Sequence, residues 1–441
     1  MEEITLDRIA VIADDLTGAS DSGVQFARKG LRTQVIFDWL GLSDGKDSLD
    51  TVVIDTDSRS IPGSMAYDRV SQAAYVLKQK GFTSIYKKLD STLRGNLGQE
   101  IKAVMDVYGF EAAAVVPAFP RIGRTTVDGK HYLNGVPVHE TEIGRDPKTP
   151  VQEADIKKLL AAQSDQSSIS IDLSTLRGGQ AAVQRCIEKA LVQHVKLLIF
   201  DAETEEDMQM LARLVPVYDQ RFLWVGSAGF AEYLPVSAKV NENLSNPEFT
   251  DSNPAMLVAG SLSEVTREQV IAVNEQPDVV AVEMDPLAIL ASSETRSKEI
   301  NRCVAELTRG VAKGFDASLH AGSSKEQVKL AKELGECLGL DSTSVSNLIS
   351  DALGEITSKL AATSSLAGLV LTGGDTAKAV CRHLGVHGIE LVQEVEPGIP
   401  LGRLLGGRQL MAVTKAGAFG TRHSLLHAMQ LLTGKGDNNH E

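Results

Sequence analysis

Residues 12–23 read IADDLTGASDSG, and this stretch decides how the first half of the chain folds. The apolar run Ile9–Ala13 ends in two carboxylates, Asp14 and Asp15, and a Thr-Gly turn and a helical pattern that stops at Gly30 follow them. A strand, a tight turn and a helix in this order place ligands at the carboxyl edge of an α/β sheet. A phosphate loop would carry a lysine where this turn carries two negative charges. The turn therefore suits hydroxyl groups, a proton or a cation, and two carboxylates would repel phosphate.

Length and composition predict a soluble protein with two α/β domains. A chain of 441 residues is too long for one ordinary core. Acidic residues outnumber basic ones by 58 to 44, and the net charge of −14 argues against nucleic-acid and anionic-membrane partners. The N-terminus, MEEITLDR, is acidic and lacks the apolar segment of a signal peptide, and no apolar run approaches about 18 residues. We therefore expect a cytoplasmic protein with no membrane contact.

Apolar strand candidates alternate with helical periods in both halves of the chain. In the first half the candidates are residues 9–13, 33–37, 51–55, 83–88, 112–116, 168–171, 196–200 and 222–225, and in the second half 256–259, 279–282, 316–320, 368–371 and 409–413. This alternation predicts the α/β class, with two domains that each hold a mostly parallel sheet flanked by helices. The polar segment 241–253, NENLSNPEFTDSN, is the best linker candidate. We predict domains over 1–235 and 255–441, joined by a linker over 236–254.

An irregular insertion, residues 117–150, interrupts the alternation. It is rich in Pro, Gly, Arg and His, and Asn134-Gly135 within it predicts a type I′ hairpin turn. Pro137 confines the second arm of this hairpin to a sheet edge. Long irregular insertions in α/β domains are usually functional or form interfaces, so a homodimer through this hairpin is one expectation.

Three polar clusters follow strand candidates in the first half. They are the Asp14-Asp15 turn, residues 55–59 (DTDSR) and residues 87–96 (KKLDSTLRGN). In a parallel sheet these three strand ends lie at one edge. An arginine and a lysine fit a carboxylate ligand, and Asp, Ser and Thr fit its hydroxyl groups. The clusters together predict a pocket for a small polyhydroxy acid, whereas each cluster alone could simply cap a helix or end a strand in solvent.

The basic loop 120–124 (PRIGR) follows another strand candidate. It could contact a phosphate or a substrate carboxylate, and a role in surface salt bridges is equally consistent with its sequence. His131 and His139 lie in the insertion without any recognised metal spacing, so no protein metal site is predicted. Residues 226–229 (GSAG) lack the spacing of a hydrolase nucleophile elbow.

Three glycine turns follow strands in the second half, at residues 258–263 (VAGSLS), 371–376 (LTGGDT) and 415–420 (KAGAFG). Each precedes a helical pattern. Glycine lets the backbone approach a ligand, and a helix N-terminus then offers N–H groups and a positive dipole to phosphate. Three such turns in one domain predict a nucleotide site.

These residues resemble the four-carbon acid sugar kinases, and the matching segments span nearly the whole chain in the order of that family. The segments are residues 13–18 (ADDLTG), 57–59 (DSR), 88–96 (KLDSTLRGN), 260–261 (GS), 372–376 (TGGDT) and 415–420 (KAGAFG). The resemblance implies an N-terminal sugar-acid-binding domain and a C-terminal ATP-binding domain. It also implies phosphoryl transfer to a terminal hydroxyl of a four-carbon acid. In one place the chain departs from the family, because Ala416 and Ala418 replace the serines that usually flank the glycine of the last loop.

The same resemblance implies the site residues. Substrate contacts fall on Asp14, Asp15, Arg59, Lys88, Leu89, Asp90 and Ser91, and ATP contacts fall on Ser261, Gly373, Gly374, Asp375, Thr376 and Gly417. Within the family, residues 20–25 (SDSGVQ) look more like the D-threonate and D-erythronate kinases than the 3-oxo-tetronate kinases.

The resemblance and the residue chemistry together predict an ATP-dependent kinase acting on the 4-hydroxyl of D-threonate. Asp15 and Asp90 are the candidates for the aspartate that orients the hydroxyl and accepts its proton. Lys88 and Arg59 would bind the substrate carboxylate or offset developing charge. Mg²⁺ would bridge the ATP phosphates, with help from Asp375, and the two domains would close to exclude water. Because neighbouring residues at a strand end point in opposite directions, only one of Asp14 and Asp15 is expected to face the substrate.

Other readings involve different substrates or different classes of protein. D-erythronate and 3-oxo-tetronate are alternative substrates within the family. A nicotinamide-dependent dehydrogenase of the same acids would need a GxGxxG turn, which the first strand lacks. A non-catalytic sugar-acid sensor on the same fold would bind the acid without releasing ADP.

Overall fold

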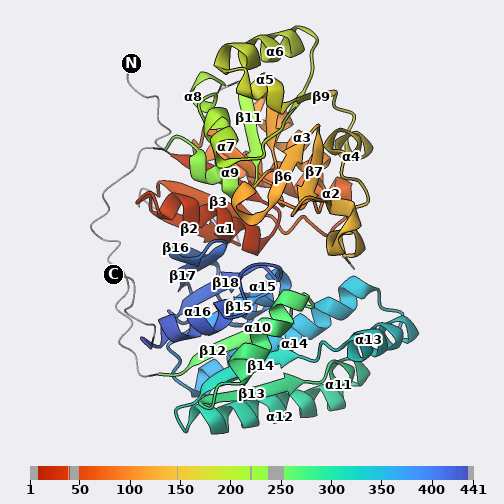
Figure 1. The fold of residues 1–441 in the computed structure, drawn as a ribbon. Coiled ribbons are helices and arrows are strands. Elements are labelled where there is room, and N and C mark those ends of the chain that lie inside the picture. The colour runs from red at the N-terminus through yellow and green to blue at the C-terminus, as the bar shows by residue number, and fades with distance from the viewer. Residues whose placement is uncertain are drawn as a thin grey trace. The chain divides into compact units, whose positions relative to one another are not determined.

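The computed structural model describes residues 8–37, 39, 49–146, 148–218, 221–236 and 253–435. The chain forms two compact units, Met1–Asn241 and Glu242–Glu441, and Figure 1 shows that each is an α/β structure. The predicted linker, 236–254, falls largely on residues outside the described ones. Among the described residues, no helix is both long and apolar enough to cross a membrane.

The first unit is built on a fully parallel sheet. Its strand order is β2-β3-β1-β4-β11-β5-β10-β9, and every neighbouring pair is parallel. The strands are β1 (Ile9–Ala13), β2 (Thr33–Ile36), β3 (Thr51–Asp55), β4 (Ser84–Lys88), β5 (Ala112–Val116), β9 (Ser168–Ile171), β10 (Leu197–Phe200) and β11 (Phe222–Gly226). The central strands are buried along their whole length, which is why they read as continuous apolar runs.

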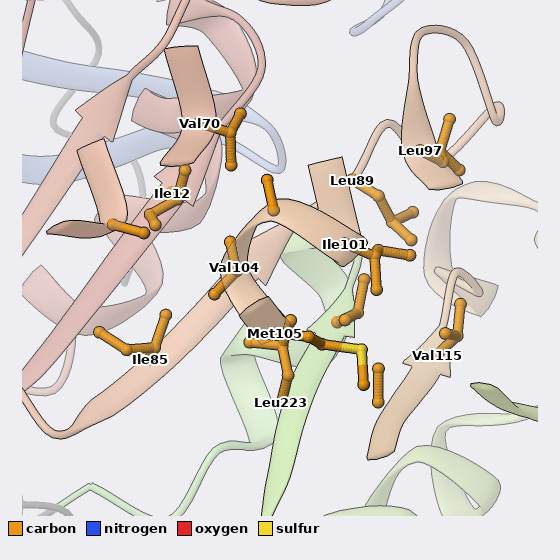
Figure 2. Close-up of a cluster of buried hydrophobic side chains, with 14 of the residues drawn as sticks. Ile12, Val70, Ile85, Leu89, Leu97, Ile101, Val104, Met105, Val115 and Leu223 are labelled. Carbon is orange, nitrogen blue, oxygen red and sulfur yellow. The ribbon is translucent and has the colours of Figure 1, made fainter. Parts of the chain in front are cut away.

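Helices cover both faces of this sheet. On one face α2 (Gly63–Gln79), α3 (Leu97–Tyr108) and α4 (Ile156–Gln163) pack in sequence, and on the other α1 (Leu16–Ala27) packs against α9 (Ala228–Tyr233). Figure 2 shows the core of the first face, where Val104 and Met105 of α3 lie close to Leu223 of the sheet. The remaining helices are α5 (Leu173–Arg177), α6 (Gln180–Val192), α7 (Glu205–Ala212) and α8 (Val215–Tyr218).

The insertion forms a small antiparallel sheet of β6 (Arg124–Val127), β7 (Lys130–Leu133) and β8 (Val136–Pro137). Asn134 and Gly135 have φ angles of 51° and 79°, as a type I′ turn requires, so the predicted hairpin is confirmed. Pro137 lies on the edge strand, also as predicted. Short 3₁₀ helices accompany this sheet, namely η2 (Pro120–Ile122), η3 (Val138–Glu140) and η4 (Glu142–Arg145).

The second unit holds a mixed sheet in the order β13-β14-β12-β15-β18-β17-β16. Its strands are β12 (Ala255–Ala259), β13 (Val279–Met284), β14 (Asp316–Ala321), β15 (Gly368–Thr372), β16 (Gly388–Glu396), β17 (Ile399–Leu405) and β18 (Met411–Lys415). The first five strands of this order are parallel, and the hairpin β16–β17, which the sequence analysis missed, joins them antiparallel. The predicted mostly parallel sheet is thus confirmed for both units.

Helices flank the sheet of the second unit as well. Residues of α10 (Glu264–Asn274) and α16 (Ser424–Leu432) share one core cluster with β12, β15 and β18. The others are α11 (Pro286–Ala291), α12 (Ser293–Val311), α13 (Lys325–Cys337), α14 (Ser342–Thr363) and α15 (Gly374–His383).

Candidate functional site

The three polar clusters of the first unit meet at one edge of its sheet. β1 lies between β3 and β4, with Ala13 opposite Asp55 and Ile12 opposite Lys87. The residues that follow these strands therefore share the carboxyl edge, where parallel sheets bind ligands.

A single guanidinium holds both carboxylates of the opening turn. Arg59 donates to Asp14 from Nε (2.6 Å to Oδ2) and from Nη2 (3.0 Å to Oδ1). It also donates to Asp15 from Nη2 (2.7 Å to Oδ1) and from Nη1 (2.9 Å to Oδ2). Both contacts are bidentate, which is the strongest geometry for an arginine and a carboxylate. Arg59 therefore reaches both aspartates at once and keeps few free donors for a ligand.

Which of the two aspartates faces the substrate stays a prediction. Their side chains do not point in opposite directions, because both reach Arg59 and Asp15 is not a continuation of the strand. It is the N-cap of α1, with extended backbone angles, and its carboxylate accepts from Gly18 N at 3.0 Å and from Thr17 Oγ1 at 2.6 Å. This cap turns the side chain of Asp15 back toward Arg59. The side chain of Asp15 is 17% exposed and that of Asp14 only 3%, so Asp15 is the more accessible of the two.

The charges of this cluster stabilise the ionised forms of its carboxylates. Burial would raise the pKa of Asp14, but Arg59 and the two lysines that end β4, Lys87 and Lys88, lower it, and the net shift is downward. Burial likewise opposes ionisation of Asp90, yet Arg94 and Arg59 hold the pKa of Asp90 well below its usual range. Both groups are therefore carboxylates at neutral pH.

Asp90 is linked to the insertion through Arg94. Arg94 donates from Nε to Asp90 at 2.8 Å and from Nη1 to Asp146 at 3.3 Å. Asp146 in turn accepts from the backbone N–H groups of Lys148 (3.0 Å) and Thr149 (2.9 Å). The insertion thus helps to orient Asp90, a role that the sequence analysis did not foresee.

Two further buried groups support the site and were not predicted as site residues. Glu100 of α3 accepts from Lys87 Nζ at 2.8 Å and from Ser58 Oγ at 2.7 Å, which ties the second and third clusters together. His131 is fully buried, and its Nε2 lies 2.8 Å from the carbonyl of Ser91. Burial lowers the pKa of His131 to about 4, so its imidazole is neutral and fixes the position of the Ser91 loop.

The other predicted substrate residues have different surroundings. Lys88 is 3% exposed and donates to the carbonyl of Leu89 at 2.7 Å, and a Cβ placed on Gly18 would lie 3.0 Å from its Nζ. The side chain of Leu89 packs into the hydrophobic core (Figure 2), so only its backbone can meet a ligand. Ser91 is 6% exposed and follows Asp90 directly in the chain.

A groove of about 480 Å³ adjoins Arg59. One side is formed by residues 59–61, 93, 95 and 96, and the other by residues 148–153, at and just after the end of the insertion, together with residues 158, 159, 162 and 163 of α4. Gln163 fastens α4 to the first side, since its amide donates to the carbonyl of Gly95 at 2.9 Å and accepts from Gly98 N at 2.8 Å. The groove gives a small ligand room next to the charged cluster.

The two arginines of the basic loop after β5 have different surroundings, one at the surface and one buried near the acidic cluster. Arg121 forms surface ion pairs with Glu205 (3.3 Å) and Glu232 (3.1 Å). Arg124 is 5% exposed, and burial lowers its pKa to about 10. The negative charges of Asp90 and Asp21 act in the opposite direction and raise the pKa of Arg124. Arg121 is thus a surface residue, while Arg124 lies within the electrostatic range of the acidic cluster.

The three glycine turns of the second unit also meet at one sheet edge. Ala259, Thr372 and Lys415 are opposite one another at the ends of β12, β15 and β18. A Cβ placed on Gly417 would lie 2.2 Å from Ser261 Oγ, and one placed on Gly373 would lie 3.5 Å from Ser261 N. Ser261 therefore lies between the other two turns.

The second turn begins a helix and the third does not. Gly373, with φ of 98°, is the N-cap of α15, so Gly374, Asp375 and Thr376 form the first turn of that helix. The helix after the third turn, α16, contains Leu425, Met429 and Leu432 as predicted, but it starts only at Ser424, so Gly417 lies outside its N-terminus. Any anion contact at Gly417 must come from the loop itself. Among the described residues, no group of three or more His, Cys, Asp or Glu side chains could hold a metal ion.

Comparisons with known proteins agree with this division of the chain. Residues 9–234 match a family of sugar-binding N-terminal domains, and residues 256–425 match a family of nucleotide-binding C-terminal domains. A D-threonate kinase from Salmonella typhimurium is 33% identical, over 96% of this chain and 97% of its own. A D-erythronate kinase from Heliobacterium modesticaldum is 32% identical, over 98% and 99%. The crystal structure of a Haemophilus influenzae protein has the same fold, with a TM-score of 0.70 at 23% identity over 96% of this chain and 99% of that one.

Proposed function

Because this chain belongs to the family of four-carbon acid sugar kinases, we propose that it transfers the γ-phosphate of ATP to the 4-hydroxyl of D-threonate. One observation carries most of this proposal. The charged cluster and the glycine turns are two separate sheet edges, and each has the chemistry of one substrate. The first edge offers carboxylates and cations for a hydroxy acid, and the second offers backbone N–H groups for phosphates.

The sugar acid is proposed to bind over Asp15, Lys88 and Asp90. Asp15 is the more accessible carboxylate of the opening turn, and it is already oriented by Arg59 and by the start of α1. A carboxylate held in this way can accept a hydrogen bond from the reacting hydroxyl and take its proton as the phosphoryl group transfers. Asp90, fixed by Arg94, is the second candidate for this role. Lys88 would offset the charge that develops during transfer.

The binding of the acid's own carboxylate needs a cation that is not already occupied. Arg59 uses four donor contacts on Asp14 and Asp15. We therefore assign Arg59 mainly to holding the aspartates, and the groove beside it to the chain of the acid. This changes the role that the resemblance implied for Arg59, which was a direct contact with the substrate carboxylate.

ATP is proposed to bind at the second unit through Ser261, the first turn of α15 and Gly417. The residues fit a triphosphate, because glycines form the close approach and the α15 N-terminus provides a favourable dipole. Asp375 is exposed in that first turn and could share a Mg²⁺ ion with the phosphates, which would neutralise their charge. No other carboxylate is proposed for this ion.

An ADP-release assay tests the proposal directly. The panel should contain Mg·ATP with D-threonate, D-erythronate, 3-oxo-tetronate and a five-carbon acid. We expect the highest kcat/KM with D-threonate. Turnover of D-erythronate in its place would correct the substrate, and no turnover with any four-carbon acid would overturn the kinase assignment.

The residue roles are tested by Asp15→Asn. We expect turnover to fall by about 10²- to 10⁴-fold, the usual range for a group that transfers a proton. ATP affinity should stay close to that of the wild type, because the substitution lies in the other unit. Asp106→Asn, an exposed carboxylate on α3, is the matched control and should leave turnover unchanged. Loss of ATP affinity in Asp15→Asn would show that the ATP site and the sugar-acid site have been assigned to the wrong units.

A further inference from the structure

Lys415, the last residue of β18, has no exposed surface, and its ammonium group points into the turn that follows it. Its Nζ donates to the carbonyls of Ala416 at 2.8 Å, Gly417 at 3.0 Å and Phe419 at 3.0 Å. A lysine has three donors, so these contacts use its full capacity. Lys415 is therefore buried under the glycine turn and cannot itself reach a ligand.

Thr266 Oγ1 also donates to the carbonyl of Gly417 at 2.8 Å, and Gln269 Nε2 to that of Phe419 at 3.0 Å. Lys415 is the one side chain that contacts all three carbonyls among the described residues, and these contacts together determine where the N–H groups of the turn point. In a trans peptide the C=O and the following N–H point in opposite directions, and the described chain has no cis peptide. The three carbonyls that face Lys415 therefore send the N–H groups of Gly417, Ala418 and Gly420 away from it. Within the described part of the chain, these three N–H groups donate to no protein acceptor, while the N–H of Phe419 closes the turn onto Ala416 at 3.1 Å.

The outward N–H groups lie where a ligand can reach them. Ala418 and Gly420 are exposed and Gly417 is partly exposed. Backbone N–H groups of a loop that are left without a protein acceptor can bind an anion, even without a helix N-terminus. Gly417 lies beside Ser261, and the carbonyl of Lys415 accepts from Gly373 N at 3.0 Å, so this loop adjoins the other two turns.

We propose that Lys415 is a positioning residue that turns the N–H groups of Gly417, Ala418 and Gly420 toward the phosphate oxygens of ATP. This inference rests on the proposed function, since it assumes that the second unit binds ATP. It explains how a loop with alanines on both sides of its glycine can bind phosphate, because only the backbone is then required. It also explains why a lysine is buried at a place where it has no contact with a ligand.

The protonation of Lys415 is consistent with a hydrogen-bonding role. Burial lowers the pKa of its ammonium to about 7, and Glu396 opposes that shift. The group is therefore partly neutral at physiological pH. A neutral amine keeps two N–H donors, so most of the carbonyl contacts remain possible in either form.

The test is nucleotide binding by the full chain, measured calorimetrically with ATP, ADP and adenosine. Lys415→Met removes all the donors, and Lys415→Gln keeps an uncharged amide with two. A hydrogen bond to a charged group such as a phosphate is worth about 1.5–3 kcal/mol. Lys415→Met should therefore weaken the binding of ATP and of ADP by about 10- to 100-fold. Adenosine, which has no phosphate, should change by less than about twofold, as for a surface substitution. Lys415→Gln should fall between Lys415→Met and the wild type.

The matched control is Lys435→Met, because Lys435 is an exposed lysine of the same unit that pairs with Asp278 at 3.0 Å. It should leave the affinity for all three nucleotides unchanged. The inference is overturned if the Lys415 variants bind ATP as the wild type does, or if they lose adenosine as strongly as ATP. If Lys415→Met does not fold, the ATP-to-adenosine ratio of Lys415→Gln decides alone. A wild-type protein that binds no ATP would instead contradict the proposed function.

Discussion

The two proposed ligand-binding edges of this protein occupy the same place in their sheets, but different groups shape them. In the first unit, charged side chains hold one another, with Arg59 between two aspartates and Arg94 between Asp90 and Asp146. In the second unit the edge consists of glycine turns, and the carbonyls of the last turn accept hydrogen bonds from the buried Lys415, with Thr266 and Gln269 as further donors. A hydroxy acid offers several different groups and needs several different side chains, whereas a phosphate can be bound by repeated N–H groups. Substitutions that change charge should therefore damage the first edge, and substitutions that change backbone space should damage the second.

The largest effect is expected from Arg59→Met. This change removes the guanidinium that contacts both Asp14 and Asp15 and leaves them only the weaker attraction of the lysines at the end of β4, and Asp14 is 3% exposed. Removing one partner of a buried ion pair typically costs about 3–5 kcal/mol, so we expect the free energy of unfolding of the first unit to fall by about that amount. Both tryptophans of the chain, Trp39 and Trp224, lie in the first unit, so urea unfolding followed by tryptophan fluorescence reports on it.

The control for this substitution is Arg69→Met. Arg69 is 38% exposed, its ion pair with Asp57 is 3.6 Å long, and it donates to the backbone carbonyls of Asp57 at 2.9 Å and Thr56 at 3.3 Å. Since these contacts are near the surface, their loss should cost about 1 kcal/mol or less. A similarly small loss for Arg59→Met would show that the aspartates do not depend on the guanidinium. The first edge would then not be held together by its charged side chains, as the comparison of the two edges requires.

The next largest effect is on the pH dependence of stability, and we expect it in the first unit, which contains His131. His131 has a pKa of about 4 in the folded protein and an ordinary value of 6.5 when unfolded. As the pH falls below about 6.5 the unfolded chain binds a proton that the folded chain does not, so stability decreases with falling pH until about pH 4. Between pH 7 and pH 5 this amounts to about 2 kcal/mol of lost unfolding free energy.

His131→Asn should remove that part of the pH dependence, as measured by tryptophan-detected unfolding at both pH values. His194→Asn is the matched control, because His194 is exposed and has a φ of 56°, a conformation that asparagine tolerates. It should keep the slope of the wild type. An unchanged slope in His131→Asn would mean that other groups cause the acid sensitivity.

Much of this arrangement could be predicted from the sequence, because each strand and turn is specified by residues that are close together in the chain. The strand ends that carry Asp14, Asp55 and Lys88 could be placed at one edge from the order of apolar runs alone. The Asn134-Gly135 hairpin followed from its two turn residues. The missed hairpin β16–β17 had a comparable local signal, since Pro397-Gly398 separates its arms and Gly398 has a φ of 78°.

The supporting residues could not be predicted in the same way, because their partners are distant in sequence. Arg94 and Asp146 are 52 positions apart, Ser58 and Glu100 are 42 apart, and Ser91 and His131 are 40 apart. No periodicity or turn chemistry links residues at such separations. The side-chain direction of Asp15 escaped prediction for a different reason, because the helix cap overrides the alternation of the strand before it.

A smaller effect is expected from Gly417→Ala in the second unit. The added Cβ would lie 2.2 Å from Ser261 Oγ, so this side chain must turn away and lose its contact with Ser263 N, which is 3.2 Å long. We expect ATP to bind about tenfold more weakly, the equivalent of one hydrogen bond of about 1.4 kcal/mol. The affinity for D-threonate should stay unchanged, because its proposed site lies in the first unit.

The origin of that effect can be checked in a double-mutant cycle. In a Ser261→Ala background the clashing oxygen is absent, so Gly417→Ala should have a smaller effect on ATP affinity than in the wild type. Equal effects in the two backgrounds would show that Ser261 is not the group that Gly417 must avoid.

The smallest effect is expected from Ala418→Ser, which restores a hydroxyl to the last glycine loop. Ala418 is exposed, so the hydroxyl should reach solvent and phosphate without strain. A hydroxyl that exchanges water for phosphate gains about 1 kcal/mol or less, so ATP affinity should rise by no more than about fivefold and adenosine affinity should not change. If side chains shaped this edge as they shape the first, one added hydroxyl would increase the affinity much more. A large gain would therefore show that the backbone of the loop binds phosphate poorly on its own, and the contrast between the two edges would lose its physical basis.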